Sequence, residues 1–252
     1  MLTNNPITSL DLTPLENLPI ANIEYLLYGT NVSSIDLEPL RGKTISSLDS
    51  LCYNCKNLTY IDLTPLADAS ITNINSMFSG CENLESFNWE GLNLSGVTSG
   101  NLSYTFKGCK KLTYIDLSPL KGANVGKLTD TFYGCIKLNT LISPFEVAPT
   151  VTSKTFGEGS TSYTGRNTYN TGGNKLIVPI NSIGYDQNYW SDVLCNSSKC
   201  GFAIEYSYEP LECTELTITA DNATGRATTT TIYWTAITNG VNNLSGETMN
   251  NV

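Results

Sequence analysis

The segment Tyr60-Ile61-Asp62-Leu63-Thr64-Pro65-Leu66 decides the fold, because its pattern occurs five times along the chain. The related segments begin at Ser9, Ser34, Ser86 and Tyr114. The third residue of each segment is Asp or Asn, at positions 11, 36, 62, 88 and 116. The spacing between these positions is nearly constant, and the last interval is the longest. A second motif, Phe78-Ser79-Gly80-Cys81 in the third unit, keeps the same phase. Self-similarity with a period of this length predicts a solenoid of stacked repeats.

Each unit predicts one short strand with an inward and an outward face. Ile61 and Leu63 alternate with Tyr60 and Asp62, which is the period of a strand whose apolar side is buried. Proline cannot donate to a strand ladder, so Pro65 should end the strand. Stacked units would then place their strands in parallel, roughly 4.8 Å apart.

Each unit also predicts a short helix before its Gly-Cys pair. Ile71, Ile74 and Phe78 are spaced at intervals of three and four, which is typical of one helix face. Gly80 then follows as a suitable stop residue. We therefore expect an α/β solenoid in which short parallel strands stack with short helices.

The Gly-Cys motif resembles that of a known group of repeats. Residues 78–84, 106–112 and 132–138 match Phe-x-Gly-Cys-x-x-Leu, which is similar to the bacterial-surface leucine-rich repeats of the BspA-like group. The resemblance covers residues 1–145 and implies a fold of the leucine-rich-repeat type. It also implies a cell-surface adhesion or host-interaction protein, or a host-range component of a phage. The fourth strand departs from the pattern with Trp89 and Gly91, which we interpret as core substitutions that keep the architecture.

The chain divides into three predicted regions. The first is a solenoid of five repeats, each of about 26 residues, over positions 1–142. Its C-terminal cap (143–209) and an incomplete Ig-like β segment (210–252) follow. Lys175–Pro179 is predicted as a strand, and Tyr185 and Trp190 approximate a pattern that closes arrays in the BspA-like group.

The C-terminal region is expected to be mostly β. Glu215–Ala220 and Thr228–Ala236 alternate as strands, with a turn between them. An Ig-like sandwich needs about seven strands, so this segment would hold only the start of such a module.

The composition argues against several classes of function. The formal net charge is −9 and no run of Lys or Arg stands out, so nucleic acid and anionic membranes would be repelled. The sequence contains no histidine, the commonest general base and nitrogen ligand for metals. No apolar run reaches the roughly 20 residues that span a bilayer. We expect no nucleic-acid partner, no membrane insertion, no cofactor and no enzymatic activity.

The start of the chain bears on its location. Residues 1–6 lack the basic start and the apolar stretch of a signal peptide, and Met1 falls in mid-unit, in the Phe column. We therefore expect a fragment, or a protein that docks another subunit at its open first rung or at its C-terminal β segment. The expected location is extracellular, at the cell surface, with a virion as the alternative.

The outward columns of the strands supply the candidate ligand-binding residues. Exposed tyrosines beside acidic residues on a sheet face are a plausible recognition surface for a protein or glycan. Stacked carboxylates could also hold a cation, or could simply bond to nearby backbone groups. A paired-carboxylate glycosidase site lacks the asymmetry that separates an acid from a base. The candidates are Tyr60, Asp62, Tyr114, Asp116, Asp36, Asp11 and Asn88.

The cysteines are interpreted mainly as core residues. Cys55, Cys81, Cys109 and Cys135 share one column, as expected of buried thiols that pack as small hydrophobes. The Cys52-x-x-Cys55 pair has no second Cys-x-x-Cys and no histidine to complete a zinc site, so no metal is expected. Cys195 and Cys200 are candidates for a disulfide.

These observations favour a non-enzymatic recognition or adhesion module of a bacterial surface protein. It would bind a protein or glycan of a host or neighbouring cell through the sheet face of the repeats. The alternative is a tail-associated or fibre-associated protein of a phage virion. An enzyme is the third hypothesis, and it would require activity that depends on an outward Asp such as Asp62.

Overall fold

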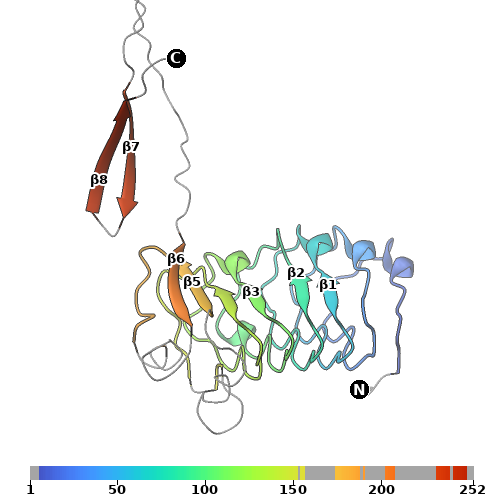
Figure 1. Ribbon diagram of the computed structural model, residues 1–252. Helices are drawn as coiled ribbons and strands as arrows, with labels where there is room; N and C mark the ends of the chain where they lie inside the picture. Colours follow the sequence, from blue (N-terminus) through green and yellow to red (C-terminus); the bar gives the residue numbers. More distant parts are fainter. Residues whose placement is uncertain are drawn as a thin grey trace, which may run out of the picture. The chain divides into compact units, whose positions relative to one another are not determined.

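The computed structural model describes residues 6–152, 154–156, 174–187, 190, 202–207, 231–238 and 241–248. The chain divides into two units, Met1–Ser207 and Tyr208–Val252. The first unit is a solenoid in which successive turns of the chain stack on one another and their short strands lie side by side (Figure 1). This arrangement confirms the predicted repeat solenoid.

The strands of the solenoid form two parallel sheets. The first sheet pairs β1 with β2, and Asp62 lies opposite Asn88 as the repeat alignment predicts. The second sheet has the order β3-β4-β5-β6, so that it continues beyond residue 142 into the predicted cap. β5 has the bounds predicted for a strand there, whereas the predicted domain boundaries stay predictions. The strands are β1 (Tyr60–Asp62), β2 (Ser86–Asn88), β3 (Tyr114–Asp116), β4 (Thr140–Ile142), β5 (Lys175–Pro179) and β6 (Ala203–Ser207).

The segment predicted as a helix, around Ile71–Phe78, forms consecutive turns instead. Ser76 and Gly80 have positive φ values, 53° and 80°, which a right-handed helix does not allow. The N–H groups of Ser76, Phe78 and Gly80 donate to carbonyls of the next rung, while those of the residues between them bond to a carbonyl within their own turn. The helix prediction was therefore wrong at this position, because stacking takes every second backbone donor.

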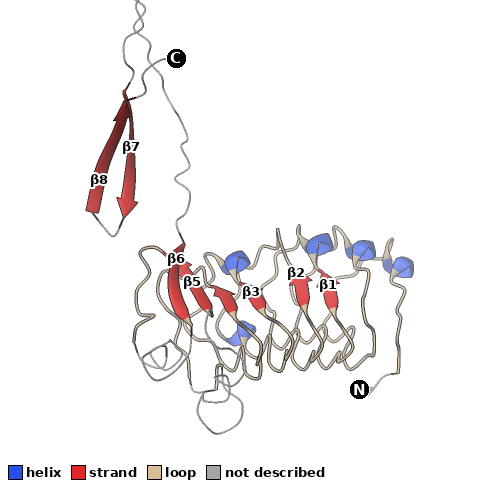
Figure 2. Ribbon diagram, in the orientation of Figure 1, coloured by secondary structure: helices blue, strands red, loops and turns tan. Residues whose placement is uncertain are grey.

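The helices whose bounds the structure describes are short 3-10 helices, and η3 and η5 each follow a strand. Four coincide with the Thr/Glu/Ser-Pro-Leu segments, where proline is well placed in the first turn. They line one edge of the solenoid, and η4 lies at the opposite edge (Figure 2). Pro65 thus lies in the first turn of a helix, whereas the preceding strand already ends at Asp62. The helices are η1 (Thr13–Leu15), η2 (Glu38–Leu40), η3 (Thr64–Leu66), η4 (Gly100–Leu102) and η5 (Ser118–Leu120).

The Asp/Asn column stabilises the same turn in each of the five units. Asp62 Oδ1 accepts the backbone N–H of Thr64 at 3.0 Å, which is an Asx turn. The same bond recurs in the other four units at 2.8–3.1 Å, from the N–H groups of residues 13, 38, 90 and 118. Asn88 makes it as well as the aspartates do, so the bond depends on the side-chain oxygen and not on the charge.

Stacked side chains fill the interior between the strands and the turns. Phe78, Phe106 and Phe132 are buried, and neighbouring ring centroids in this column are 5.9 Å apart. Phe156 continues the stack at 5.1 Å from Phe132, which the sequence pattern did not reveal. It also contacts Trp190, so that the aromatic core extends into the region predicted as a cap.

The cysteine column lies beside this stack. Cys55, Cys81, Cys109 and Cys135 are buried, which confirms their interpretation as packed thiols. Each S–H group donates to a backbone carbonyl of the preceding rung, as Cys109 does to Phe78 at 3.2 Å. Burial raises the pKa of the Cys109 thiol well above its usual value, so that it stays protonated and remains a donor. The candidate disulfide between residues 195 and 200 lies outside the described residues.

The second unit contains one described strand pair. β7 (Thr231–Thr238) and β8 (Val241–Thr248) are antiparallel, with Thr238 opposite Val241. β7 overlaps the strand predicted at 228–236, whereas β8 was not predicted. The other predicted strand, at 215–220, lies outside the described residues. The Ig-like module therefore stays a prediction.

The aromatic stack gives a direct test of the core. Phe106→Ala should lower the free energy of unfolding by about 3–5 kcal/mol, because the buried ring leaves a cavity. Phe106→Leu should cost less, since buried Leu27 already occupies this column in the first unit. Urea denaturation followed by circular dichroism measures both. A loss below about 1 kcal/mol for the alanine variant would contradict the stack.

The Asx turns give a second test. Asp62→Ala should lower the free energy of unfolding by about 1 kcal/mol, because the Thr64 N–H loses its acceptor. Asp62→Asn should leave stability nearly unchanged, as Asn88 accepts the equivalent bond in the next unit. Equal destabilisation of the two variants, measured by the same denaturation, would show that the charge matters and not the acceptor.

Candidate binding groove between strands β2 and β3

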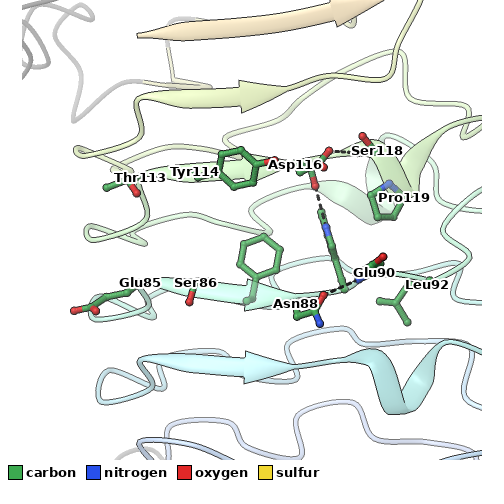
Figure 3. A pocket seen from close by; sticks show the side chains of 13 residues that line it. Glu85, Ser86, Asn88, Glu90, Leu92, Thr113, Tyr114, Asp116, Ser118 and Pro119 are labelled. Carbon is green, nitrogen blue, oxygen red and sulfur yellow. Dashed lines mark hydrogen bonds between the residues drawn. The ribbon is translucent and has the colours of Figure 1, made fainter. Parts of the chain in front are cut away.

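The two sheets are separate because the strand ladder is interrupted between β2 and β3. Within the sheets, the Leu63 N–H donates to Asn88 O at 2.7 Å, and the Leu117 N–H donates to Ile142 O at 2.9 Å. Trp89 occupies the same column, but here its indole Nε1–H donates to Asp116 O at 2.9 Å (Figure 3). A side-chain donor thus takes the place of a backbone donor where β2 and β3 are not paired.

Larger side chains and a longer unit accompany this interruption. Phe87 and Trp89 stand where the preceding unit has Ile61 and Leu63, and the two rings pack edge to face at 5.0 Å. Gly91, with φ 78°, replaces the proline of the other units. The step from Asn88 to Asp116 is also longer than any earlier step of the Asp/Asn column. The fourth unit therefore differs from its neighbours in the side chains and in the backbone path that govern strand pairing.

The opening is confined to the sheet face of the solenoid. On the turn side, the same two rungs remain joined, because the Phe78 N–H donates to Thr105 O at 2.9 Å and the Gly80 N–H to Lys107 O at 2.7 Å. Phe106 also packs beneath the gap, 5.3 Å from Phe87 and 5.7 Å from Trp89. The floor of the gap is thus a packed aromatic core, which makes the gap a shallow groove.

The groove has a volume of about 640 Å³, within the range of small-ligand sites. β2 and the residues on both sides of it form one wall, and β3 and the start of η5 form the other (Figure 3). Its lining includes Glu85, Ser86, Phe87, Asn88, Trp89, Glu90, Leu92, Thr113, Tyr114, Asp116, Ser118 and Pro119.

The charged groups of the groove are carboxylates. Glu85, Glu90 and Asp116 supply carboxylates, and the lining residues include neither Lys nor Arg. Glu85 is paired with Lys111 at 3.1 Å, at the end of the groove. Burial raises the pKa of the Tyr114 phenol, and the neighbouring Asp116 carboxylate raises it further. Tyr114 therefore keeps its proton at neutral pH, and its hydroxyl donates to the Asp116 side chain.

The groove brings together three of the predicted binding residues, Asn88, Tyr114 and Asp116. Tyr60 and Asp62 lie on the sheet face of β1, outside the groove, and the exposed fraction of Tyr60 is 44% against 50% for Tyr114.

The remaining two predicted residues are not near this groove. Asp36 lines a second hollow with Glu38 and Arg41, which form a salt bridge at 2.6 Å. Asp11 belongs to the first unit and is exposed. The predicted column is thus spread along the solenoid, and the structure gathers only part of it.

Sequence reasoning missed Phe87, Trp89, Glu85 and Glu90 as lining residues. The signal was present in the long step that ends at Asp116 and in the two aromatic substitutions of the fourth strand. The interpretation that these changes keep the architecture holds for the solenoid, but it did not predict the missing strand pairing. The solenoid continues through them, but its sheet does not.

The described residues were also searched for metal sites and for membrane-spanning helices. Within them, no three His, Cys, Asp or Glu side chains come together in a group that could hold a metal ion. The helices found in the same residues include none long and apolar enough to cross a membrane.

Comparison with known protein families gives one match. The family model described as "Mycoplasma protein of unknown function, DUF285" matches residues 42–168, which is half of the chain and includes both walls of the groove. This family is associated with BspA-like repeat proteins, in agreement with the resemblance of the Gly-Cys motif. No curated protein and no solved structure shows significant similarity to the chain. The repeats and the family match together show that this chain belongs to the DUF285 family.

Proposed function

We propose that this protein is a non-enzymatic recognition module that binds a protein or glycan through the sheet face of its solenoid. The observation that carries the proposal is the aromatic groove between β2 and β3, where a rigid repeat scaffold is opened on one face only. Concave sites with apolar lining and a few convergent polar groups are the usual form of a ligand site.

The polar groups of the groove favour recognition over catalysis. Asp116 Oδ1 accepts the Ser118 N–H at 2.8 Å, and the Trp89 indole donates to Asp116 O. These groups already hold the scaffold, so they are suited to a fixed surface that a ligand meets without rearrangement. Half-exposed Tyr114 adds a large amphipathic contact, of the kind that dominates many recognition surfaces.

The wider context of the proposal is display at a cell surface. The BspA-like resemblance implies adhesion to a host or neighbouring cell, and the strand columns beside the groove offer a broad additional contact area. A partner would therefore anchor in the groove and extend along the sheet face toward β1.

A comparison of two tyrosines tests this proposal. The chain is screened against host surface proteins and a glycan array, and the affinity for each hit is measured by surface plasmon resonance. Tyr114→Ala should weaken binding by about tenfold or more, as expected for an anchor residue. Tyr60→Ala should weaken it less, because Tyr60 lies in the same column at the intact part of the ladder.

Both tyrosines are exposed, so circular dichroism should show that the two variants remain folded. Unchanged binding in the Tyr114 variant, or an equal loss in the two variants, would contradict the groove as the anchor. A screen that finds no protein or glycan ligand would contradict the function itself.

A further inference from the structure

We propose that the groove between β2 and β3 receives a cationic side chain, Arg or Lys, from a partner protein. This inference rests on the proposed function, because it assumes that the groove is the anchor site. It goes further in choosing a protein partner over a glycan and in stating the charge that the partner must present.

The lining of the groove is negatively charged. Glu85, Glu90 and Asp116 surround the groove, and its lining contains no basic side chain to balance them. Lys111 pairs with Glu85 at 3.1 Å, whereas Glu90 and Asp116 have no ion pair within the part of the chain that the structure describes. An anionic ligand would be repelled here, while a cation would find two carboxylates that lack a counterion.

The lining of the groove also contains aromatic rings. Phe87 and Tyr114 present rings to the groove, and a cation over an aromatic ring is attracted by the ring quadrupole. The protein already uses this interaction elsewhere, because Lys107 Nζ lies 5.1 Å from the centroid of the Tyr104 ring and 5.2 Å from that of Tyr133. The apolar stem of an Arg or Lys would pack on Leu92 while its charged head reaches a carboxylate.

Acidic residues outside the groove add to its negative electrostatic potential. The Asp column continues along the solenoid from the groove with Asp62, Asp36 and Asp11, and the formal net charge of the chain is −9. Such a surface attracts a basic partner over a distance and orients it before contact. A neutral saccharide could use the rings and the acceptors, but it would gain nothing from this field.

The test uses three small probes and the whole chain. The probes are Nα-acetyl-arginine methylamide, the corresponding citrulline derivative, which is a neutral isostere, and the neutral disaccharide cellobiose. Binding is followed by NMR through the indole signal of Trp89, whose Nε1–H lies at the groove. The arginine derivative should shift this signal, and the citrulline derivative should bind about tenfold more weakly or not at all.

Charge-removing variants locate the effect. Glu90→Gln combined with Asp116→Asn should reduce the affinity for the arginine derivative by about tenfold. The Asx turn survives the second change, because Asn88 accepts the equivalent bond from the Glu90 N–H at 3.1 Å. Asp68→Asn is the matched control, since it removes a charge from an exposed side chain outside the groove lining and should leave the affinity unchanged.

The outcomes separate this inference from the function on which it rests. Equal binding of the arginine and citrulline derivatives, or binding of cellobiose alone, would overturn the cationic ligand and leave the groove as a recognition site. Absence of any shift at Trp89 with all three probes would also overturn the inference. If, in addition, ligands from the host screen bind equally well to the Tyr114→Ala variant, the proposed function fails with it.

Discussion

The structure depends on one constraint. A single turn of the solenoid cannot bury its apolar side chains or satisfy its backbone hydrogen bonds without its neighbours. Every second N–H group of the turn segments donates to the following rung, as Phe78 does to Thr105, and the phenylalanine rings of neighbouring rungs stack on each other. The cysteine thiols donate to carbonyls of the preceding rung. Each rung is therefore completed by its neighbours, and a change within one unit acts first on the contact between two units.

The groove follows from that constraint. In the fourth unit, aromatic residues replace the aliphatic residues of the strand, and the indole of Trp89 takes over a bond that a backbone amide makes in the third and fifth units. The solenoid survives because the turn side of the same rungs keeps its backbone bonds. On the sheet side the Trp89 indole, and not the Trp89 backbone amide, bonds to Asp116 O, so that the ladder is interrupted there. A site thus arises within a regular scaffold without a separate loop or domain.

Much of the fold could be predicted from the sequence, because stacking forces each column to keep its chemistry. Ile61 is buried and Tyr60 exposed, as the alternation of the strand predicted. The helix at Ile71–Phe78 was predicted wrongly, because overlapping turns bury residues at spacings of three and four just as a helix does. The repeat pattern does not extend to the strands after β4. Ile142 pairs with Ile177, and because this step is longer than any repeat, the period no longer holds. In the second unit, β8 was missed although Asn239-Gly240 precedes it, a pair that favours tight hairpins.

The candidate site was predictable only in part for a related reason. A column predicts which residues face outward, and so it identified Tyr114 and Asp116. It does not predict the distance between neighbouring strands, because that distance depends on how Trp89 and Phe87 pack in three dimensions. The departure from the repeat was visible in the sequence, but its consequence for the ladder required the structure.

The interrupted ladder is the central claim, and amide hydrogen exchange measured by NMR tests it most directly. The amides of Leu63 and Leu117 are bonded across the ladder, whereas none of the described residues offers the Trp89 amide a backbone acceptor. The Trp89 amide should therefore exchange several-fold faster than the other two, since a hydrogen bond worth about 1 kcal/mol corresponds to roughly fivefold protection. Equal protection of the three amides would show that the ladder is continuous, and it would contradict the groove and the functions proposed for it.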